Sequence, residues 1–265
     1  MSKLKAAVIG VGGISNEHIN GYIKNPDVEL YAFCDINETQ LKYMSEKYNI
    51  PAERCFADKD EMLKALPEID IVSVCTWNAA HAECTIAALN AGKDVICEKP
   101  MAMNTKQAEE MLKAAKDNGR HLQIGFVRRY GNDADVMRDF IESGKFGEIY
   151  YAKATAIRRR AVPTWGVFTN EYEQGGGSLI DIGTHALDLT LWMMDNYKPK
   201  AVLGAAFHKL GKQTETGNAW GDWDTENFTA EESCFGMITM ENGACIMLES
   251  SWALNTLQEG EARTT

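Results

Sequence analysis

Two short segments of the chain hold side chains that could handle a proton. Lys99 stands in Glu98-Lys99-Pro100, directly after the apolar run Val95–Cys97, which we expect to be a buried strand. Open α/β sheets place their ligands at the carboxyl ends of strands, and a lysine there could stabilise a developing alkoxide. Asp181 and His185 follow a run of glycines and are four residues apart, so one helical turn would put them on one face. They could form an acid/base pair, although a solvated lysine and a structural histidine are the plainer alternatives.

A glycine-rich turn near the N-terminus could hold a phosphate group. The segment Gly10-Val11-Gly12-Gly13-Ile14-Ser15 lies between an apolar run at residues 6–9 and a helical pattern at residues 14–24. Gly10 would allow a tight turn, Gly12 would let the backbone approach a pyrophosphate, and the start of the helix at Gly13 and Ile14 would meet its charge. Ser15 stands where a third glycine or alanine is usual. The order of strand, turn and helix predicts a dinucleotide site.

Asp35 indicates which dinucleotide the site would prefer. It ends the next strand-like run, residues 28–34, and lies 35 − 15 = 20 positions after Ser15. A carboxylate at that distance can accept hydrogen bonds from the adenine-ribose hydroxyls. No lysine or arginine occurs at residues 36–38, so a 2′-phosphate would face an anion without a cationic partner. We therefore predict NAD rather than NADP; the alternative is that Asp35 only caps the next helix.

The elements that must position these residues alternate through the first half of the chain. Short apolar runs are followed by segments with helical spacing, which predicts a parallel sheet covered on both faces, the doubly wound class. The expected strands are residues 6–9, 28–34, 69–75, 95–97 and 122–126, and helical patterns occur near residues 14–24, 41–48, 86–91 and 105–118. We expect residues 1–125 to form a Rossmann dinucleotide-binding domain.

The second half, residues 126–265, predicts an α+β domain for substrate binding and oligomerisation, with a largely antiparallel sheet. Its elements are a strand at 149–158, one helix at Thr184–Met194, and strands at 201–207, 228–240 and 244–253. Asn242-Gly243 between the last two runs is a strong hairpin signal. Residues 208–226 read as a long loop. The last residues, 260–265, show no closing element, so we expect this domain to be truncated at its C-terminus.

Composition excludes several classes of function. The formal charge of −11 disfavours nucleic acid and anionic membranes as partners. No run reaches the roughly 18 apolar residues of a membrane span, and the N-terminal apolar run reads as a strand rather than a signal peptide. The seven cysteines are scattered without a CxxC pair, which favours reduced thiols and a cytoplasmic protein and predicts no metal site.

The quoted motifs resemble the Gfo/Idh/MocA oxidoreductases, which act on sugars, cyclitols and related polyols with NAD or NADP. The matching pieces occur in order along the chain: GVGGIS at 10–15, Asp35, EKP at 98–100, GFVRRY at 125–130 and GGGSLIDIGTHALDL at 175–189. By this resemblance Lys99, Asp181 and His185 form the active site. It also implies that the Lys99-Pro100 peptide bond is cis, and that the chain self-associates as a dimer or tetramer.

The resemblance implies further ligand contacts. The stretch 76–81 resembles a family segment near the cofactor, with Trp77 in place of a proline, so Thr76, Asn78 and His81 are candidate cofactor contacts together with Glu98 and Lys99. Arg128, Arg129 and Tyr130 match a segment where an arginine touches cofactor or substrate. We assign Arg128 to the cofactor, and Arg129 and Tyr130 to the substrate with Lys99, Asp181 and His185, leaving open which arginine makes contact.

Several side chains permit more than one reading. Trp165, Trp220 and Trp223 could stack on a sugar ring or pack in a core or lid, and we include Trp165 among the substrate-binding residues. Residues 158–160, three arginines, read as a solvated strand end rather than a phosphate clamp, because side chains on a strand alternate faces. The main functional reading is an NAD-dependent dehydrogenase in which Lys99 and His185 handle the proton of a sugar or polyol carbinol. The alternatives are a glycoside-cleaving enzyme that uses NAD transiently, and a non-catalytic NAD sensor.

Overall fold

The chain forms two compact units, residues Met1–Gly125 and Phe126–Thr265. The structure is a computed structural model that describes residues 2–215, 217–256 and 260–265; side chains at 260–262 are outside the description.

The first unit is a parallel sheet with the strand order β3-β2-β1-β4-β5-β6. The strands that follow β1 are added on one side of it as far as β3, and the later strands, from β4 on, are added on its other side. This change of side is the arrangement that places ligands at the carboxyl ends of β1 and β4. The strands are β1 Leu4–Ile9, β2 Val28–Cys34, β3 Cys55–Phe56, β4 Ile71–Val74, β5 Asp94–Cys97 and β6 Leu122–Ile124. The helices are α1 Ser15–Lys24, α2 Glu38–Tyr48, α3 Lys59–Ala65, α4 Asn78–Asn90 and α5 Thr105–Asn118, with a 3₁₀ turn η1 at Ala52–Arg54.

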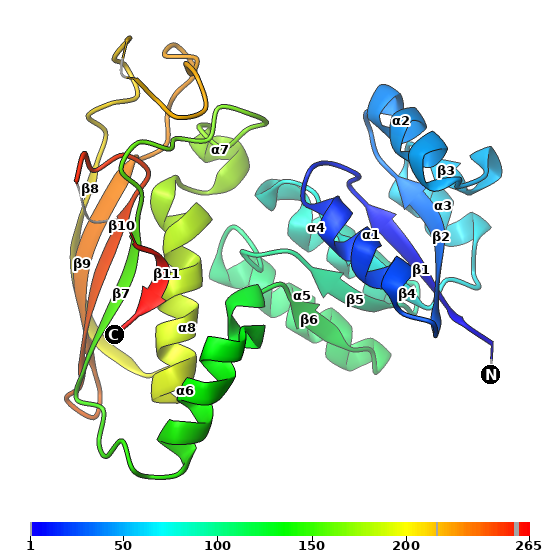
Figure 1. The fold of residues 1–265 in the computed structure, drawn as a ribbon. Coiled ribbons are helices and arrows are strands. Elements are labelled where there is room, and N and C mark those ends of the chain that lie inside the picture. The colour runs from blue at the N-terminus through cyan, green and yellow to red at the C-terminus, as the bar shows by residue number, and fades with distance from the viewer. Residues whose placement is uncertain (1, 216, 257–259) are drawn as a thin grey trace. The chain divides into compact units, whose positions relative to one another are not determined.

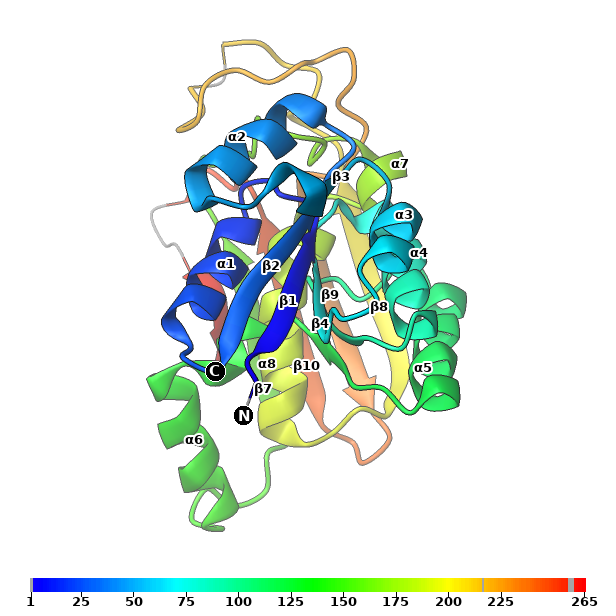
Figure 2. The ribbon, with the colours of Figure 1, turned by 90° about the vertical axis from the view of Figure 1, so that its right-hand side faces the viewer.

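Alternation along the strands divides the apolar side chains between two cores. In β1, Ala6 and Val8 face a cluster shared with α1 and α2, whereas Ala7 and Ile9 face one shared with α3, α4 and α5. Figure 2 shows the two sets of helices on opposite faces of the sheet. Because both faces are buried, these strands are predominantly apolar, as parallel strands usually are. The doubly wound fold expected from the sequence is confirmed.

The second unit is a mixed sheet covered on one face by helix α8 (Figure 1). Its strand order is β11-β7-β10-β9-β8, and the pairs are antiparallel except β10 with β7. The alternating alanines of β7, at 152, 154 and 156, are buried beneath the helix and leave room for its close approach. The elements are η2 Val127–Tyr130, α6 Asn132–Glu142, β7 Tyr151–Ile157, α7 Glu171–Gln174, the π-helix η3 Leu179–Gly183, α8 Thr184–Met194, β8 Pro199–Phe207, β9 Ser233–Met240, β10 Cys245–Ser251 and β11 Gly260–Thr264.

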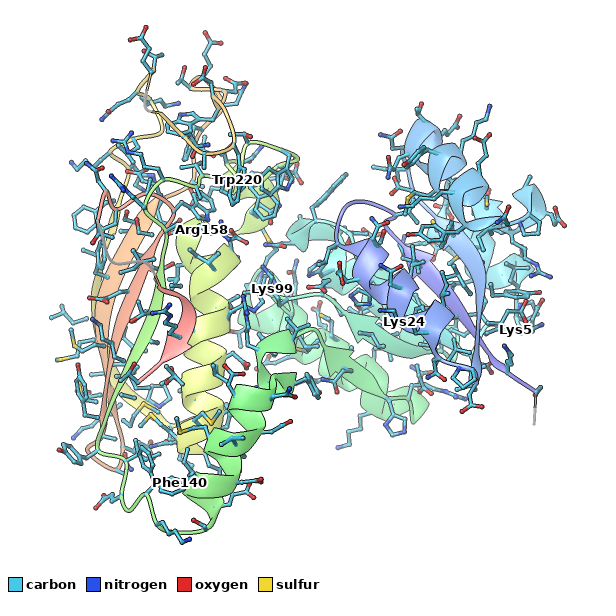
Figure 3. All side chains as sticks on the ribbon, viewed as in Figure 1. Lys5, Lys24, Lys99, Phe140, Arg158 and Trp220 are labelled. Atoms are coloured by element: carbon cyan, nitrogen blue, oxygen red, sulfur yellow. The ribbon has the colours of Figure 1, made fainter. Side chains whose placement is uncertain are left out.

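Two expectations for this unit were wrong, and one helix was not predicted. The last residues are not without structure, because β11 pairs with β7 and adds a strand to the sheet. The strand expected at 228–240 begins only at Ser233. Helix α6 was not predicted, although Val136, Met137 and Phe140 have helical spacing; these side chains are exposed, and Phe140, labelled in Figure 3, is 47% exposed. The predicted helix at Thr184–Met194 and the hairpin between β9 and β10 are present.

All seven cysteines are free, and the buried ones, Cys34, Cys75, Cys84 and Cys97, all belong to the first unit. In the part of the chain that the structure describes, no helix combines the length and the apolar character that crossing a membrane requires.

Candidate active site

The glycine turn after β1 has the geometry of a phosphate loop. Gly10 has φ +84°, and a Cβ there would lie 2.8 Å from the backbone of Cys75, so only glycine fits. Gly12 and Gly13 have no neighbour within 4 Å of a Cβ position, which leaves their backbone open to a ligand. The Ser15 hydroxyl donates to the Gly12 carbonyl at 2.6 Å and closes the turn from within. An open turn of this kind at the start of α1 fits a dinucleotide pyrophosphate.

Asp35 lies beside this turn and stabilises it. One carboxylate oxygen accepts from the Val11 N–H at 2.7 Å and the other from the Asn37 N–H at 2.8 Å. The carboxylate is therefore fixed at the end of β2, with lone pairs left for ribose hydroxyls. The capping role goes to Asn37 instead, whose side chain accepts from the Gln40 N–H. Gln40 in turn donates to the Val11 carbonyl at 2.8 Å, a contact that the sequence did not suggest.

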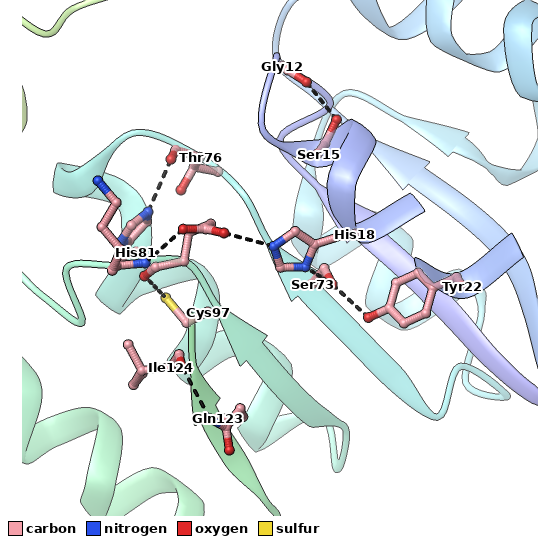
Figure 4. Close-up of polar contacts among 12 residues, drawn as sticks. Gly12, Ser15, His18, Tyr22, Ser73, Thr76, His81, Cys97, Gln123 and Ile124 are labelled. Carbon is pink, nitrogen blue, oxygen red and sulfur yellow. Dashed lines mark hydrogen bonds and ion pairs between the residues drawn. The ribbon is translucent and has the colours of Figure 1, made fainter. Parts of the chain in front are cut away.

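Glu98 is the centre of a polar network at the carboxyl end of β5, of which Figure 4 shows His18, Ser73 and Tyr22. Its carboxylate is 7% exposed; one oxygen lies 2.9 Å from His18 Nε2 and the other accepts from the Lys99 N–H at 3.1 Å. His18 Nδ1 lies 2.9 Å from the Ser73 hydroxyl, which also bonds Tyr22. Burial disfavours the charged carboxylate, but His18 and Lys99 more than compensate, so the pKa of Glu98 lies below its ordinary value. Glu98 thus fixes the backbone that carries Lys99.

The segment between β4 and α4 is joined to the segment that follows β5 through hydrogen bonds of His81. Thr76 precedes α4, Asn78 begins it and is largely buried, and His81 is wholly buried one turn later. The two His81 ring nitrogens lie 2.7 Å from the Pro100 carbonyl and 3.1 Å from the Thr76 carbonyl. Burial lowers the pKa of His81 although both carbonyls favour its charged form. His81 therefore connects the backbone at Thr76 with the backbone at Pro100, and its contact with a cofactor stays a prediction.

The Lys99-Pro100 peptide bond is cis, as the resemblance implied. Lys99 itself is half-buried and follows Glu98 in the sequence.

In the second unit, a buried carboxylate organises the backbone that leads to Asp181 and His185. Glu231 accepts from the N–H of Gly177 at 2.6 Å and of Leu179 at 3.0 Å, and its carbonyl accepts from Ser178 at 3.0 Å. A Cβ at Gly177 would lie 1.9 Å from that carbonyl oxygen, so the approach requires glycine. A carboxylate at the positive end of a helix is favourable.

Asp181 lies in the π-helical turn that follows, and His185 is the second residue of α8. The Trp252 indole N–H donates to an Asp181 oxygen at 2.8 Å, and Arg158 Nη1 lies 3.8 Å from the same oxygen. Both Asp181 and His185 are partly exposed. The expectation of a solvated Arg158 was wrong: β7 ends at Ile157, and the Arg158 side chain turns inward to the carboxylate.

Arg129 is engaged within the second unit. Its guanidinium forms a two-pronged ion pair with buried Asp188, which raises the pKa of Arg129. Arg128 and Tyr130, by contrast, are exposed. Of the two arginines, Arg128 has the more accessible side chain for a ligand.

The three candidate tryptophans are placed differently. Trp165 and Trp220 are both partly exposed and meet edge to face, with ring centroids 4.9 Å apart. Trp223 packs against Phe228 and donates to the Gly211 carbonyl, so it belongs to the core. Figure 3 shows Arg158 close to Trp220, and the guanidinium carbon lies 5.2 Å from the ring centroid. Among the residues described, no three His, Cys, Asp or Glu side chains gather as a metal site would require.

Comparison with known proteins identifies the family. Residues 4–126 match the oxidoreductase family with an NAD-binding Rossmann fold, and residues 135–264 match the GFO/IDH/MocA C-terminal domain. The chain is 40% identical over 259 residues to D-glucoside 3-dehydrogenase of Escherichia coli K12, covering 97% of this chain and 73% of that protein. It is 30% identical over 198 residues to inositol 2-dehydrogenase of Salmonella paratyphi B, covering 74% of this chain and 56% of the relative. The structure of aldose-aldose oxidoreductase from Caulobacter crescentus matches with a TM-score of 0.81 at 26% identity, over 96% of this chain and 72% of the other.

The protein therefore belongs to the Gfo/Idh/MocA family of NAD-binding oxidoreductases, and the resemblance stated from the sequence is confirmed. The expected enzyme class, a dehydrogenase acting on CH–OH groups, is confirmed as well.

Proposed function

We propose that the protein oxidises a ring carbinol of a sugar, glycoside or cyclitol with NAD. The observation that carries the proposal is the placement of Asp181. Trp252 and Arg158 hold its carboxylate one turn before His185, on a helix whose start is fixed by the buried Glu231. Relatives of this chain bear the names of dehydrogenases for D-glucosides and inositol, both of which have secondary ring hydroxyls.

Each residue of the site has a distinct role in this proposal. NAD, when bound at the glycine turn, supplies the hydride acceptor. His185 removes the hydroxyl proton, because a neutral imidazole is available near pH 7. Lys99 donates to the same oxygen and stabilises the alkoxide. Asp181 accepts from a neighbouring hydroxyl and orients the ring. Arg128 and Tyr130 remain candidates for ligand contacts. Arg129 forms an ion pair with Asp188 and stabilises the segment that carries Arg128 and Tyr130.

Turnover of a panel of D-glucosides, cyclitols and free sugars, followed as NADH absorbance, tests this assignment. His185→Asn should lower kcat by about 10²–10⁴-fold. Lys99→Ala should cost about 10²–10³-fold. The double variant should lose less than the product, because both groups serve one proton transfer. In His185→Asn, NAD affinity, measured by fluorescence, should stay near the wild-type value. Normal turnover in either variant would remove that residue from the mechanism, and NADH-free cleavage of a glycoside would favour the glycoside-cleaving reaction.

We also propose that NAD is preferred over NADP. The Asp35 carboxylate is fixed beside the glycine turn, and the next side chain, Ile36, brings no charge to balance a 2′-phosphate. Asp35→Ser should narrow the difference in kcat/KM between the two cofactors, because it removes the anion but retains a hydroxyl for hydrogen bonding. Equal kcat/KM for both cofactors in the wild type would contradict this assignment.

The open face of the second sheet supports self-association. Strand β8 is an edge strand that is exposed along its whole length, and it carries apolar side chains such as Val202 and Leu203, the latter 74% exposed. Exposed apolar sheet surface with an unpaired edge is unfavourable in water. We therefore propose that two copies of the chain meet over this surface. Sedimentation velocity should show a dimer or larger at micromolar concentration, and Leu203→Asp should weaken it; a well-behaved wild-type monomer would refute the proposal.

A further inference from the structure

We infer that Trp165 and Trp220 form an aromatic platform for the second ring of a glycoside, the ring that is not oxidised. The inference rests on the proposed function, because it concerns how the same site selects its substrate. The two indoles are 52% and 43% exposed, and their planes meet at 69° with centroids 4.9 Å apart. They form a corner in which one flat ligand ring can touch a face and an edge at once.

The platform is fixed rather than free to swing. The Thr164 hydroxyl donates to the Trp220 carbonyl at 2.8 Å, and the Ala219 N–H donates to the Arg160 carbonyl at 3.1 Å. The Asn218 side chain bonds both the N–H and the carbonyl of Val162 at 2.9 Å. The segments 160–164 and 218–221 are thus joined by hydrogen bonds although they lie far apart in the sequence. A surface held in place before a ligand arrives loses little entropy on binding.

Arg158 decides which ring of the substrate the platform can accept. Its guanidinium lies 3.8 Å from the Asp181 carboxylate on one side and over the Trp220 ring on the other, 5.2 Å from the centroid. A sugar ring whose hydroxyl is bound by Asp181 is therefore separated from the open indole surfaces by this guanidinium. A ring that stacks on Trp165 and Trp220 must be a neighbouring one, linked to the first through a glycosidic oxygen.

The chemistry of the two surfaces matches a sugar ring. One face of a pyranose carries C–H groups whose small positive charge is attracted to the negative face of an aromatic ring. Its hydroxyl rim needs polar partners, which the Arg158 guanidinium, over the Trp220 ring, can supply. Aromatic surface combined with a few fixed polar groups is typical of small-molecule sites.

The test compares substrates with one ring and with two. Methyl β-D-glucopyranoside and cellobiose, and methyl α-D-glucopyranoside and maltose, are assayed as matched pairs with wild-type enzyme, Trp165→Ala, Trp165→Phe and Trp220→Ala. The control is Tyr172→Ala, which removes another exposed aromatic side chain of the same unit, 83% exposed on α7. Trp165→Ala is the main variant because it removes the more exposed of the two rings and leaves the contact between Arg158 and Trp220 in place.

We expect Trp165→Ala to lower the ratio of kcat/KM for the two-ring over the one-ring glycoside by about 5- to 10-fold, the equivalent of one aromatic contact. Trp165→Phe should restore part of this ratio, and Tyr172→Ala should leave it unchanged. The Kd of the disaccharides, measured by calorimetry with NAD present, should rise in parallel in Trp165→Ala and Trp220→Ala. An unchanged ratio and an unchanged Kd in both would overturn the platform while leaving the oxidoreductase assignment intact. If the tryptophan variants bind disaccharides more weakly than the wild type, but the wild type forms no NADH from any of the glycosides, the platform would be supported and the proposed function refuted.

Discussion

Gly177→Ala provides a sharp test of how the helix carrying Asp181 and His185 is positioned. The added Cβ would lie 1.9 Å from the Glu231 carbonyl oxygen and 2.9 Å from its carbonyl carbon, and both are backbone atoms that cannot swing aside. The segment around Glu231 must move, which breaks or stretches hydrogen bonds from three successive N–H groups. Two of these bonds reach a buried carboxylate, and bonds to charged groups contribute about 1.5–3 kcal/mol each. Allowing for relaxation, we expect a loss of about 3–5 kcal/mol in the free energy of unfolding.

Thermal unfolding followed by circular dichroism measures this loss. A change of that size should lower the Tm by roughly 10 °C in a chain of this length. Turnover should fall as well, because the Asp181 N–H bonds the Gly177 carbonyl at 2.9 Å and moves with it. The matched control is Gly21→Ala in α1, where a Cβ has no neighbour within 4 Å and where alanine should stabilise the helix by about 0.5–1 kcal/mol. A Gly177→Ala protein that melts within about 2 °C of wild type would show that the Glu231 segment yields easily, and the argument would be wrong.

Two further predictions concern the buried carboxylates. Because the pKa of Glu98 is lower in the folded than in the unfolded state, its contribution to stability is present above pH 4.5 and is lost as the pH falls through the folded value. Glu98→Gln should therefore destabilise the protein by about 1.5–3 kcal/mol at pH 7, and by less once the pH has fallen through the folded value. A pH-independent difference in urea midpoints would contradict the stabilisation of the carboxylate by its contacts with His18 and the Lys99 N–H. Asp188→Ala should lower the free energy of unfolding by about 1–3 kcal/mol, less than the loss of a fully buried pair, because the Arg129 side chain is 28% exposed. The substitution should also raise KM more than it lowers kcat. An unchanged Tm would show that Arg129 needs no partner.

Local signals along the chain were sufficient to predict much of the fold. The apolar runs that became β1, β2 and β5 are recognisable because parallel strands buried on both faces contain few polar residues. The helix at Thr184–Met194 was found at its observed bounds, since the glycine run before it and the apolar spacing within it are both local features. The π-helical turn at Leu179–Gly183 was not foreseen, because residue spacing alone does not separate it from an ordinary helical turn.

Contacts between distant parts of the sequence could not be predicted in this way. His18 meets Glu98 across 80 positions and Glu231 meets Gly177 across 54, and neither glutamate belongs to a pattern that announces its partner. Arg158 was assigned to a solvated strand end because alternation along a strand would separate the three arginines, whereas β7 ends at Ile157 and the Arg158 side chain turns toward Asp181. Strand β11 was missed because Gly260–Thr264 lacks the apolar residues of a typical strand.

Four cysteines are buried in the first unit, so their rate of alkylation reports how often that unit opens. Burial raises the pKa of Cys34 and Cys97 to about 12 and that of Cys84 to about 11, so these thiols carry almost no thiolate at neutral pH and are also shielded from reagents. Alkylation at these positions must wait until the parallel sheet opens, whereas Cys234 and Cys245, which are partly exposed in the second unit, can react in the folded state. Pulse alkylation read by mass spectrometry would therefore time the opening of the cofactor-binding half without any substitution, and adding NAD should slow only the late-reacting group.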